Sequence, residues 1–154
     1  MEKYKKINQE KAHQEKFPIG ICYYSSEIKK YPLVTFSKEL GSDIIFAEYS
    51  KNLKVDLAMA QEIVNNRLDF TQNKNHYFII DFSNINYFNQ EAKAYMQSPE
   101  GGAKNVLAAA FMASNMVATL LANVFIRKIK DVPSKFFSNK KDALKWIKGL
   151  KNER

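Results

Sequence analysis

The stretch HYFIIDFSNINYFNQEAKAYM, residues 76–96, decides the fold of this chain. Tyr77–Phe82 is apolar except for Asp81 and is rich in aromatic and β-branched residues, which predicts a central strand covered on both faces. A polar turn follows Asp81, and Asn89 is the expected N-cap of the next helix. Binding sites in open α/β sheets lie at such strand-to-helix turns, so this turn is the first candidate functional surface.

Strands and helices alternate on both sides of this stretch. The expected order is β-β-α-β-α-β-α-β-α, which predicts an α/β fold with a mixed, mostly parallel sheet of about five strands and about four helices. The flanking elements are expected to be an antiparallel hairpin of strands at 32–39 and 43–49, a helix capped by Asp56, a polar loop at 71–76, a strand at 106–113, a helix capped by Ser114 or Asn115, a strand at 134–137, and a last helix capped by Ser138.

One domain is expected over residues 32–150. A polar N-terminal arm and an irregular segment over residues 1–31 precede it, and residues 151–154 form a tail. The net charge is +8, and residues 127–154 carry ten basic against three acidic side chains. Lys141, Lys145 and Lys148 share one face of the predicted last helix, which we interpret as a solvated face. Trp146 is expected to pack on the sheet, so no specific nucleic-acid surface is predicted.

The segment Val106–Ile126 has no charged residue over 21 positions and is long enough to span a membrane. Its Ser, Thr, Asn and Ala content, and the capping pair Ser114-Asn115, favour a strand followed by a buried helix. The N-terminal sequence does not resemble a signal peptide. The single cysteine, Cys22, excludes an internal disulfide, and a cytoplasmic protein is expected.

Candidate catalytic groups do not converge in the sequence. Asp81 and Ser83 lack the paired acids of an aspartyl-phosphate site and are expected to bond backbone groups of the turn. His13 and His76 are the only histidines, and His76 lies about 20 Å from Ser83 at strand rise. No metal motif and no phosphate-binding glycine loop is present. We therefore predict a protein that is not an enzyme, without metal or cofactor.

The order of elements and two motifs resemble a known family. FIIDFSNINYF, residues 78–88, is similar to the strand and the Asp-Leu-Ser-Asn-Val continuation of STAS domains, the SpoIIAA-like fold of anti-sigma-factor antagonists. KFFSNKKDALKWIKGL, residues 135–150, resembles the end of an uncharacterised bacterial STAS/SEC14-like subgroup. The resemblance covers residues 32–150 and implies a mixed α/β fold and a role in protein interaction.

The sequence departs from this family at the expected switch. The antagonists carry Asp-Ser-Ser-Gly at the helix start, where a kinase phosphorylates a serine, whereas this chain has Asn89-Gln90-Glu91-Ala92 and no hydroxyl. Glu91 either mimics a negative charge or is an ordinary acid at a helix start. The resemblance thus implies a regulatory or interaction module without a phosphorylation switch. Its expected partner-binding residues are Ser83, Asn84, Asn89, Gln90 and Glu91.

A second surface is expected on the helix that follows Asn115. Val117, Leu120, Leu121, Val124 and Phe125 are predicted to face inward. The outer positions would then be Met116, Ala118, Thr119, Ala122 and Asn123, which are bland for a solvent face and predict a homodimer. The self-association candidates are Met116, Thr119, Ala122 and Asn123. The SEC14-like resemblance and the apolar segment 106–126 leave one alternative open, a carrier of a small ligand such as a lipid or nucleotide.

Overall fold

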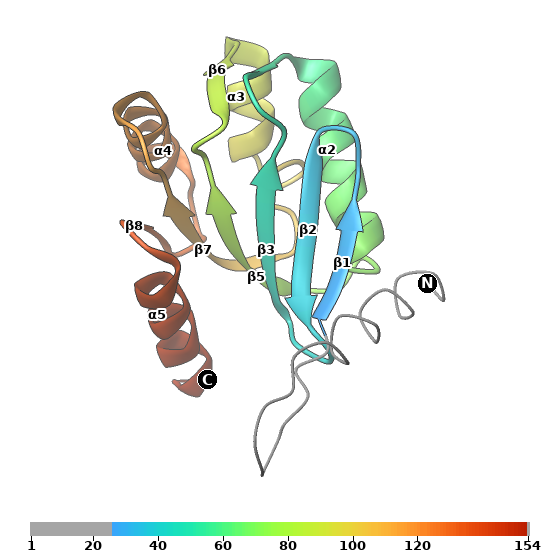
Figure 1. Cartoon of the computed structure of the whole chain (residues 1–154), viewed down its shortest axis with the longest axis vertical. Helices are drawn as coiled ribbons and strands as arrows, with labels where there is room; N and C mark the ends of the chain where they lie inside the picture. The colour runs from blue at the N-terminus through green and yellow to red at the C-terminus, as the bar shows by residue number, and fades with distance from the viewer. Residues whose placement is uncertain (1–25, 154) are drawn as a thin grey trace, which may run out of the picture.

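The structure of the chain, a computed structural model, describes residues 26–153 (Figure 1). The polar arm and Cys22 lie outside the described residues. In chain order the elements are β1 (Ser26–Lys30), β2 (Val34–Glu39), β3 (Ile44–Tyr49), β4 (Leu53–Val55), α2 (Leu57–Phe70), β5 (His76–Asp81), β6 (Ile85–Phe88), α3 (Gln90–Gln97), β7 (Val106–Met112), α4 (Met116–Lys128), β8 (Ser134–Phe137) and α5 (Lys140–Asn152).

The main sheet has six strands in the order β1-β2-β3-β5-β7-β8. β1, β2 and β3 are antiparallel neighbours, and the pairs β3–β5, β5–β7 and β7–β8 are parallel. The predicted α/β class, the mostly parallel sheet and the opening hairpin are confirmed. The number of strands differs from the prediction, because β1 extends the sheet and β4 pairs with β6 in a separate small sheet.

Helices cover both faces of the main sheet. α2, α3 and α4 pack on one face and α5 packs on the other (Figure 1). Side chains of a strand alternate between the two faces, and β5 follows this rule. Phe78 and Ile80 join the core beneath α2, α3 and α4, whereas Tyr77 and Ile79 pack against Ala143 of α5. The apolar run that predicted a doubly covered central strand is therefore β5.

Phe82, directly after β5, is a centre of aromatic packing. Its ring lies 5.3 Å from the rings of both Phe111 and Phe125, edge to face, and 5.7 Å from that of Phe88. Tyr49 approaches it edge-on at 6.2 Å. Edge-to-face pairs add to the free energy of burial. This packing fixes the end of β5 and thereby the position of the turn that follows.

Side-chain caps begin the helices as the sequence predicts, with one exception. Asp56, Asn89 and Asn115 each accept a hydrogen bond from a backbone N–H in the first turn. The predicted cap of the last helix, Ser138, is wrong by one residue. Asn139 Oδ1 accepts from the Asp142 N–H at 2.9 Å, and Asn139 Nδ2 donates to the Asp142 carboxylate. The cap is the residue whose side-chain oxygen reaches the backbone N–H three positions later, and this residue is Asn139.

Two predicted boundaries are corrected, and two short strands are added. Residues 26–30, assigned to the irregular N-terminal part, form the edge strand β1. His76, assigned to the loop at 71–76, is the first residue of β5 and is buried. β4 and β6 are new elements of three and four residues. Such short strands have too few residues to show an alternating pattern.

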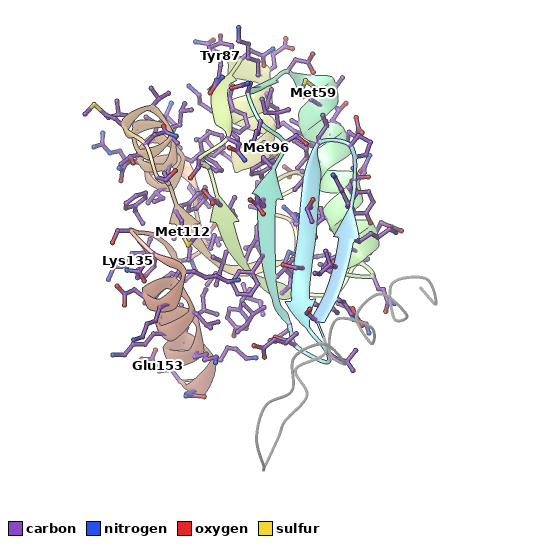
Figure 2. All side chains as sticks on the ribbon, in the orientation of Figure 1. Met59, Tyr87, Met96, Met112, Lys135 and Glu153 are labelled. Carbon is purple, nitrogen blue, oxygen red and sulfur yellow. The ribbon has the colours of Figure 1, made fainter. Side chains whose placement is uncertain are left out.

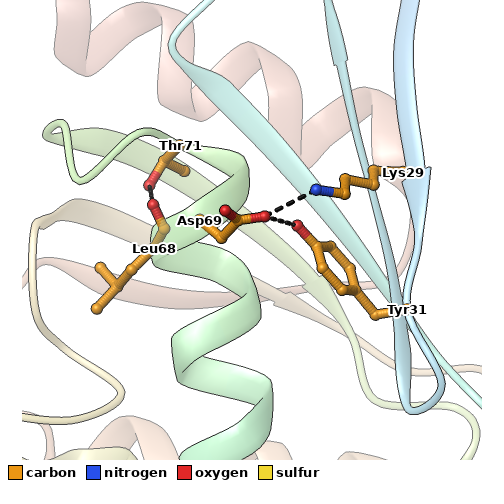
Figure 3. A network of polar contacts seen from close by, with 5 residues as sticks. All are labelled: Lys29, Tyr31, Leu68, Asp69 and Thr71. Atoms are coloured by element: carbon orange, nitrogen blue, oxygen red, sulfur yellow. Dashed lines mark hydrogen bonds and ion pairs between the residues drawn. The ribbon is translucent and has the colours of Figure 1, made fainter. Parts of the chain in front are cut away.

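An exposed polar contact attaches β1 to α2 (Figure 3). Asp69 accepts hydrogen bonds from Lys29 Nζ at 2.8 Å and from the Tyr31 hydroxyl at 2.6 Å. The hydrogen bond from Lys29, and then that from Tyr31, holds the pKa of the Asp69 carboxyl below its usual value. The same contact raises the pKa of Lys29 to about 12. The edge strand is thus tied to the helix layer at its C-terminal end.

Candidate functional site

The turn after β5 is a closed hydrogen-bonded structure. Asp81 Oδ1 accepts from the Ser83 N–H at 2.9 Å and from the Ser83 hydroxyl at 2.5 Å. The Ser83 hydroxyl oxygen accepts from the Ser114 N–H at 2.9 Å, and Asn115 Nδ2 donates to the Ser83 carbonyl at 2.8 Å. The prediction that Asp81 and Ser83 bond groups of the turn is confirmed. The turn is also bonded to Ser114 and Asn115, the two residues before α4.

Asn84 joins the same turn to the neighbouring strands. Its Nδ2 donates to the Tyr49 carbonyl at 2.9 Å, and its own carbonyl accepts from the Leu53 N–H at 2.9 Å. The turn therefore bridges the C-terminal ends of β3, β5 and β7. Ser83 and Asn84 are half-buried, and their hydrogen-bonding groups face this framework. Both residues position the turn rather than present free groups to a partner.

Beyond the turn, β6 runs parallel to β4 and forms the small sheet. Ile85 and Phe88 point into the core, and Asn86 and Tyr87 point to solvent. Tyr87 is 55% exposed and lies at the outer end of the molecule (Figure 2). Its register partner on β4 is Lys54. Sequence reasoning missed Tyr87, although the apolar residues at 85 and 88 flank two exposed positions.

The helices α2 and α3 begin side by side, directly after the paired strands β4 and β6. Val55 is the register partner of Phe88, so the caps Asp56 and Asn89 follow at equivalent positions. The Asn89 N–H donates to the Val55 carbonyl at 3.0 Å. Asn89 Oδ1 accepts from the Ala92 N–H at 2.8 Å. Asn89 therefore has a structural role as the cap that fixes the start of α3.

Gln90 and Glu91 are exposed in the first turn of α3. An acid in this turn interacts favourably with the helix dipole. The five predicted partner-binding residues do not form one cluster, because the four residues of β6, about 13 Å of strand, separate Ser83 and Asn84 from the others. The accessible part of the predicted site is Gln90 and Glu91. The structure adds Tyr87 of β6, the strand that leads into α3, and its register partner Lys54. We call these four residues the β6–α3 edge.

The predicted faces of α4 are wrong in part. Phe125 is buried and Leu121 packs against the core, as predicted. Ala118, Ala122 and Phe125 are the buried residues of this helix, and Ala122 is fully buried. Val117 and Leu120, predicted to face inward, are exposed, and Val124 lies at the border of exposure. Of the four self-association candidates, Met116 is exposed at 79%, Thr119 and Asn123 are half-buried, and Ala122 is inaccessible. Small residues lie inward because they let the helix axis approach the sheet closely.

Two polar side chains are buried on the α2 side of the sheet. Arg67 of α2 is 1% exposed and donates to three backbone carbonyls, those of Gly102 at 2.7 Å, Lys104 at 2.8 Å and Gly101 at 3.4 Å. Burial lowers the pKa of the Arg67 guanidinium to about 10. Among residues 26–153 no carboxylate pairs with it. Arg67 thus anchors the loop between α3 and β7.

His76 is the second buried polar side chain. Its Nδ1 lies 2.9 Å from the Lys74 carbonyl, which identifies Nδ1 as the protonated ring nitrogen, and Nε2 has no partner within the described chain. Burial lowers the pKa of His76 to about 4. The imidazole is therefore neutral at pH 7. His76 opens β5, whereas Ser83 follows its other end, as the sequence predicts.

The internal space near Arg67 is small. A cavity of about 30 Å³ is lined mainly by apolar side chains, including Tyr49, Phe78, Phe111 and Ile129. This volume accommodates about one or two water molecules.

A surface groove of about 260 Å³ lies between β3 and α5, with Ile44, Phe46 and Leu144 as apolar lining and Lys148 and Lys151 at its side. Lys151 also forms an ion pair with Asp43.

Two kinds of feature are absent from the described residues. No group of three His, Cys, Asp or Glu side chains within residues 26–153 has the arrangement of a metal site. In the same part of the chain, no helix has the length and apolar character needed to cross a membrane. The uncharged segment 106–126 forms β7, the capped turn and most of α4, as the sequence predicts.

Comparisons with known proteins come from families, curated proteins and solved structures. No curated protein matches the chain. A similar solved structure is an uncharacterised protein of the DUF3478 family from Shewanella loihica PV-4, described as having a SpoIIAA-like fold. The two chains are 13% identical with a TM-score of 0.46, over 85% of this chain and 98% of the other. The class of the fold follows from this chain's own strand order. Residues 38–151 match the family Domain of unknown function (DUF7793), so the chain belongs to that family.

Proposed function

We propose that this chain is a non-enzymatic, STAS-like interaction module that binds a protein partner through the β6–α3 edge and has no phosphorylation switch. The observation that carries the proposal is the placement of Tyr87. The β4–β6 pair holds this large aromatic side chain 55% exposed beside the exposed start of α3. Exposed tyrosines are frequent anchors of protein interfaces, because they combine apolar area with a hydroxyl and few rotatable bonds.

The rigidity of the edge supports a contact role. Hydrogen bonds from Asn84 and Asn115 fix the turn before β6. The cap Asn89, directly after β6, fixes the start of α3. A preformed surface loses little conformational entropy when a partner binds. The edge therefore suits recognition of a folded surface.

The missing hydroxyl supports the absence of a switch. Positions 89–92 read Asn-Gln-Glu-Ala, and Asn89 is occupied as a helix cap. The anti-sigma-factor antagonists that the chain resembles acquire a negative charge at this helix start by phosphorylation. In this chain Glu91 supplies a negative charge there without modification. A partner that recognises this edge would meet an acidic group at all times.

The proposal is tested by affinity purification from the native host with a matched control. Gln90→Lys with Glu91→Lys replaces the one negative charge at these two positions with two positive charges. Gln61→Lys with Glu62→Lys makes the same two changes at exposed positions of α2. A partner should be retained by the wild type and by the α2 variant, lost by the α3 variant, and should bind again when both purified proteins are mixed. A set of bound proteins that neither variant changes, or that both abolish, would contradict the proposal.

The alternative role, a carrier of a lipid or nucleotide, relates to the groove between β3 and α5. Its apolar lining and two lysines suit an anionic ligand, whereas the internal cavity has room for water alone. Native mass spectrometry of protein purified from its host distinguishes the two roles. A retained small molecule, lost with Phe46→Ala and Lys148→Ala, would favour the carrier. Unliganded protein that binds a protein partner favours the module.

A further inference from the structure

The outer face of α4 is the largest concentration of exposed apolar side chains in the described chain. Residues 26–153 expose seven large apolar side chains. Four of them lie on this one helix: Met116, Val117, Leu120 and Val124. The others, Ile28, Leu40 and Tyr87, lie on three different segments. Four such side chains on one helix mark an interaction site rather than scattered surface apolar residues.

The polar groups of this face are already bonded to the helix itself. The Thr119 hydroxyl donates to the Asn115 carbonyl at 2.8 Å, and Asn123 Nδ2 donates to the Thr119 carbonyl at 3.0 Å. Removing water from the face therefore leaves these two donors satisfied. No charged side chain occurs in α4 before Arg127. The face can become dry in a complex without burying a charge.

We propose that the outer face of α4 binds a second copy of this chain in an antiparallel, two-fold symmetric helix pair centred on Leu120. Met116, Leu120 and Val124 are spaced by four residues and form one ridge along the helix. Ridges of this spacing on two helices interlock at a crossing angle of about −50°. A two-fold axis at Leu120 places Met116 of one copy beside Val124 of the other.

Charge selects the antiparallel arrangement. Arg127 and Lys128 lie together at the C-terminal end of α4. A parallel pair would bring four basic side chains together. With the axis at Leu120, the two Arg127 residues lie about 20 Å apart at 1.5 Å of rise per residue, which exceeds the Debye length of about 8 Å.

The same charge pattern disfavours a membrane surface as the occupant. Helices that lie on membranes carry Lys and Arg along a polar face, whereas the basic residues of α4 are confined to its last turn. The inner face of α4 is also buried against the core through Ala118 and Ala122. The four apolar side chains expose on the order of 400 Å², below the roughly 800 Å² per partner of a stable complex. We therefore expect a reversible dimer with a dissociation constant on the order of 10–100 μM.

Sedimentation equilibrium of the full chain, from about 10 μM to about 1 mM, tests the proposal. The wild type should be a dimer at the upper concentration. Leu120→Glu should weaken association about 30-fold or more, because it brings two unpaired carboxylates together at the axis. Leu40→Glu is the matched control, since Leu40 is 58% and Leu120 is 62% exposed, and should not change association.

A mixing experiment tests the position of the axis. Leu120→Glu and Leu120→Lys should each be monomeric alone, and an equimolar mixture should form a heterodimer. A strictly monomeric wild type at about 1 mM, or a dimer that Leu120→Glu leaves intact, would overturn the proposal. Binding to vesicles of anionic lipid that Leu120→Glu abolishes, with the protein monomeric in solution, would also overturn it and assign the face to membranes. These variants leave the β6–α3 edge unchanged, so the two proposals stand or fall separately.

Discussion

Two regions of this molecule place side chains against the usual preference of their type. On the α2–β5 side, a guanidinium and an imidazole are almost fully buried. On α4, methionine, leucine and valine side chains face solvent. Both regions pack on the same face of the sheet. The difference lies in the groups that contact these side chains: backbone groups in the first region, and solvent in the second.

Arg67 is buried because backbone groups meet it. Three carbonyl oxygens of the loop before β7 accept its N–H groups, which offsets part of the cost of desolvating a charge. Leu120 is exposed because no element within residues 26–153 covers it, so in this part of the chain its apolar area contacts water. The first region is complete within the monomer, and we propose that the second is completed by another chain.

Replacing Arg67 should have the largest effect on stability. Arg67→Met removes the donors and leaves three carbonyls in a dry environment, so we expect a loss of about 3–5 kcal/mol in the free energy of unfolding. Urea denaturation followed by circular dichroism measures it. Lys104→Ala, which keeps the Lys104 carbonyl but removes an exposed side chain, is the control. A loss below about 1 kcal/mol would mean that the loop does not depend on this anchor.

The pH dependence of stability should reveal His76. Its pKa is about 4 in the folded state and about 6.5 in the unfolded chain, so the unfolded chain binds more protons between these values. The contribution of the neutral imidazole is fully present above pH 6.5 and decreases as pH falls, by about 3 kcal/mol at pH 4. Urea denaturation of the wild type and His76→Gln over this range isolates the effect. Parallel curves for the two proteins would show that His76 titrates normally.

Changes in side-chain size should affect stability strongly on the buried face of α4 and weakly on its exposed face. Ala122→Leu places a larger side chain at a fully buried position and should cost about 1–3 kcal/mol. Leu120→Ala shortens an exposed side chain and should change the stability of the monomer by less than about 0.5 kcal/mol. Thermal unfolding at a concentration below the dimer range compares them. Equal effects at both positions would show that the face assignment is wrong.

A small effect is also expected at Asp69, two residues after Arg67 on α2. Asp69→Asn weakens an ion pair whose side chains are 41% and 61% exposed, so the loss should be about 0.5 kcal/mol. The depressed pKa of Asp69 means that this contribution is present above pH 4 and disappears as pH falls below it. Salt titration of the unfolding midpoint should reduce the difference between Asp69→Asn and wild type. A salt-independent difference would attribute it to the Tyr31 hydrogen bond.

Much of the fold could be predicted because the strong signals are local. The uninterrupted run before Asp81 marked the central strand, and the caps Asp56, Asn89 and Asn115 marked three helix starts. A cap depends on a side chain and a backbone N–H two or three residues away, so sequence neighbours determine it. Similarly, the absence of a hydroxyl over residues 89–92 is a property of the sequence and needs no coordinates.

The candidate site was predicted in part, because its accessible residues depend on a pairing that is distant in sequence. β6 becomes a strand through its register with β4, which brings Lys54 and Tyr87 together. The predicted Ser83 and Asn84 lie in the turn but are occupied by bonds to Ser114, Asn115 and Tyr49. No local pattern reports those distant partners.

The sequence by itself determined the order of most elements, the class of the sheet and the absence of a hydroxyl over residues 89–92, because these follow from neighbouring residues. Tertiary structure alone decided which side of α4 faces the core. Periodicity shows that a helix has an apolar stripe, and this helix has two candidates, a large-residue ridge around Leu120 and a small-residue stripe through Ala118 and Ala122. Close approach to the sheet selected the small residues, and this choice left the large ones exposed.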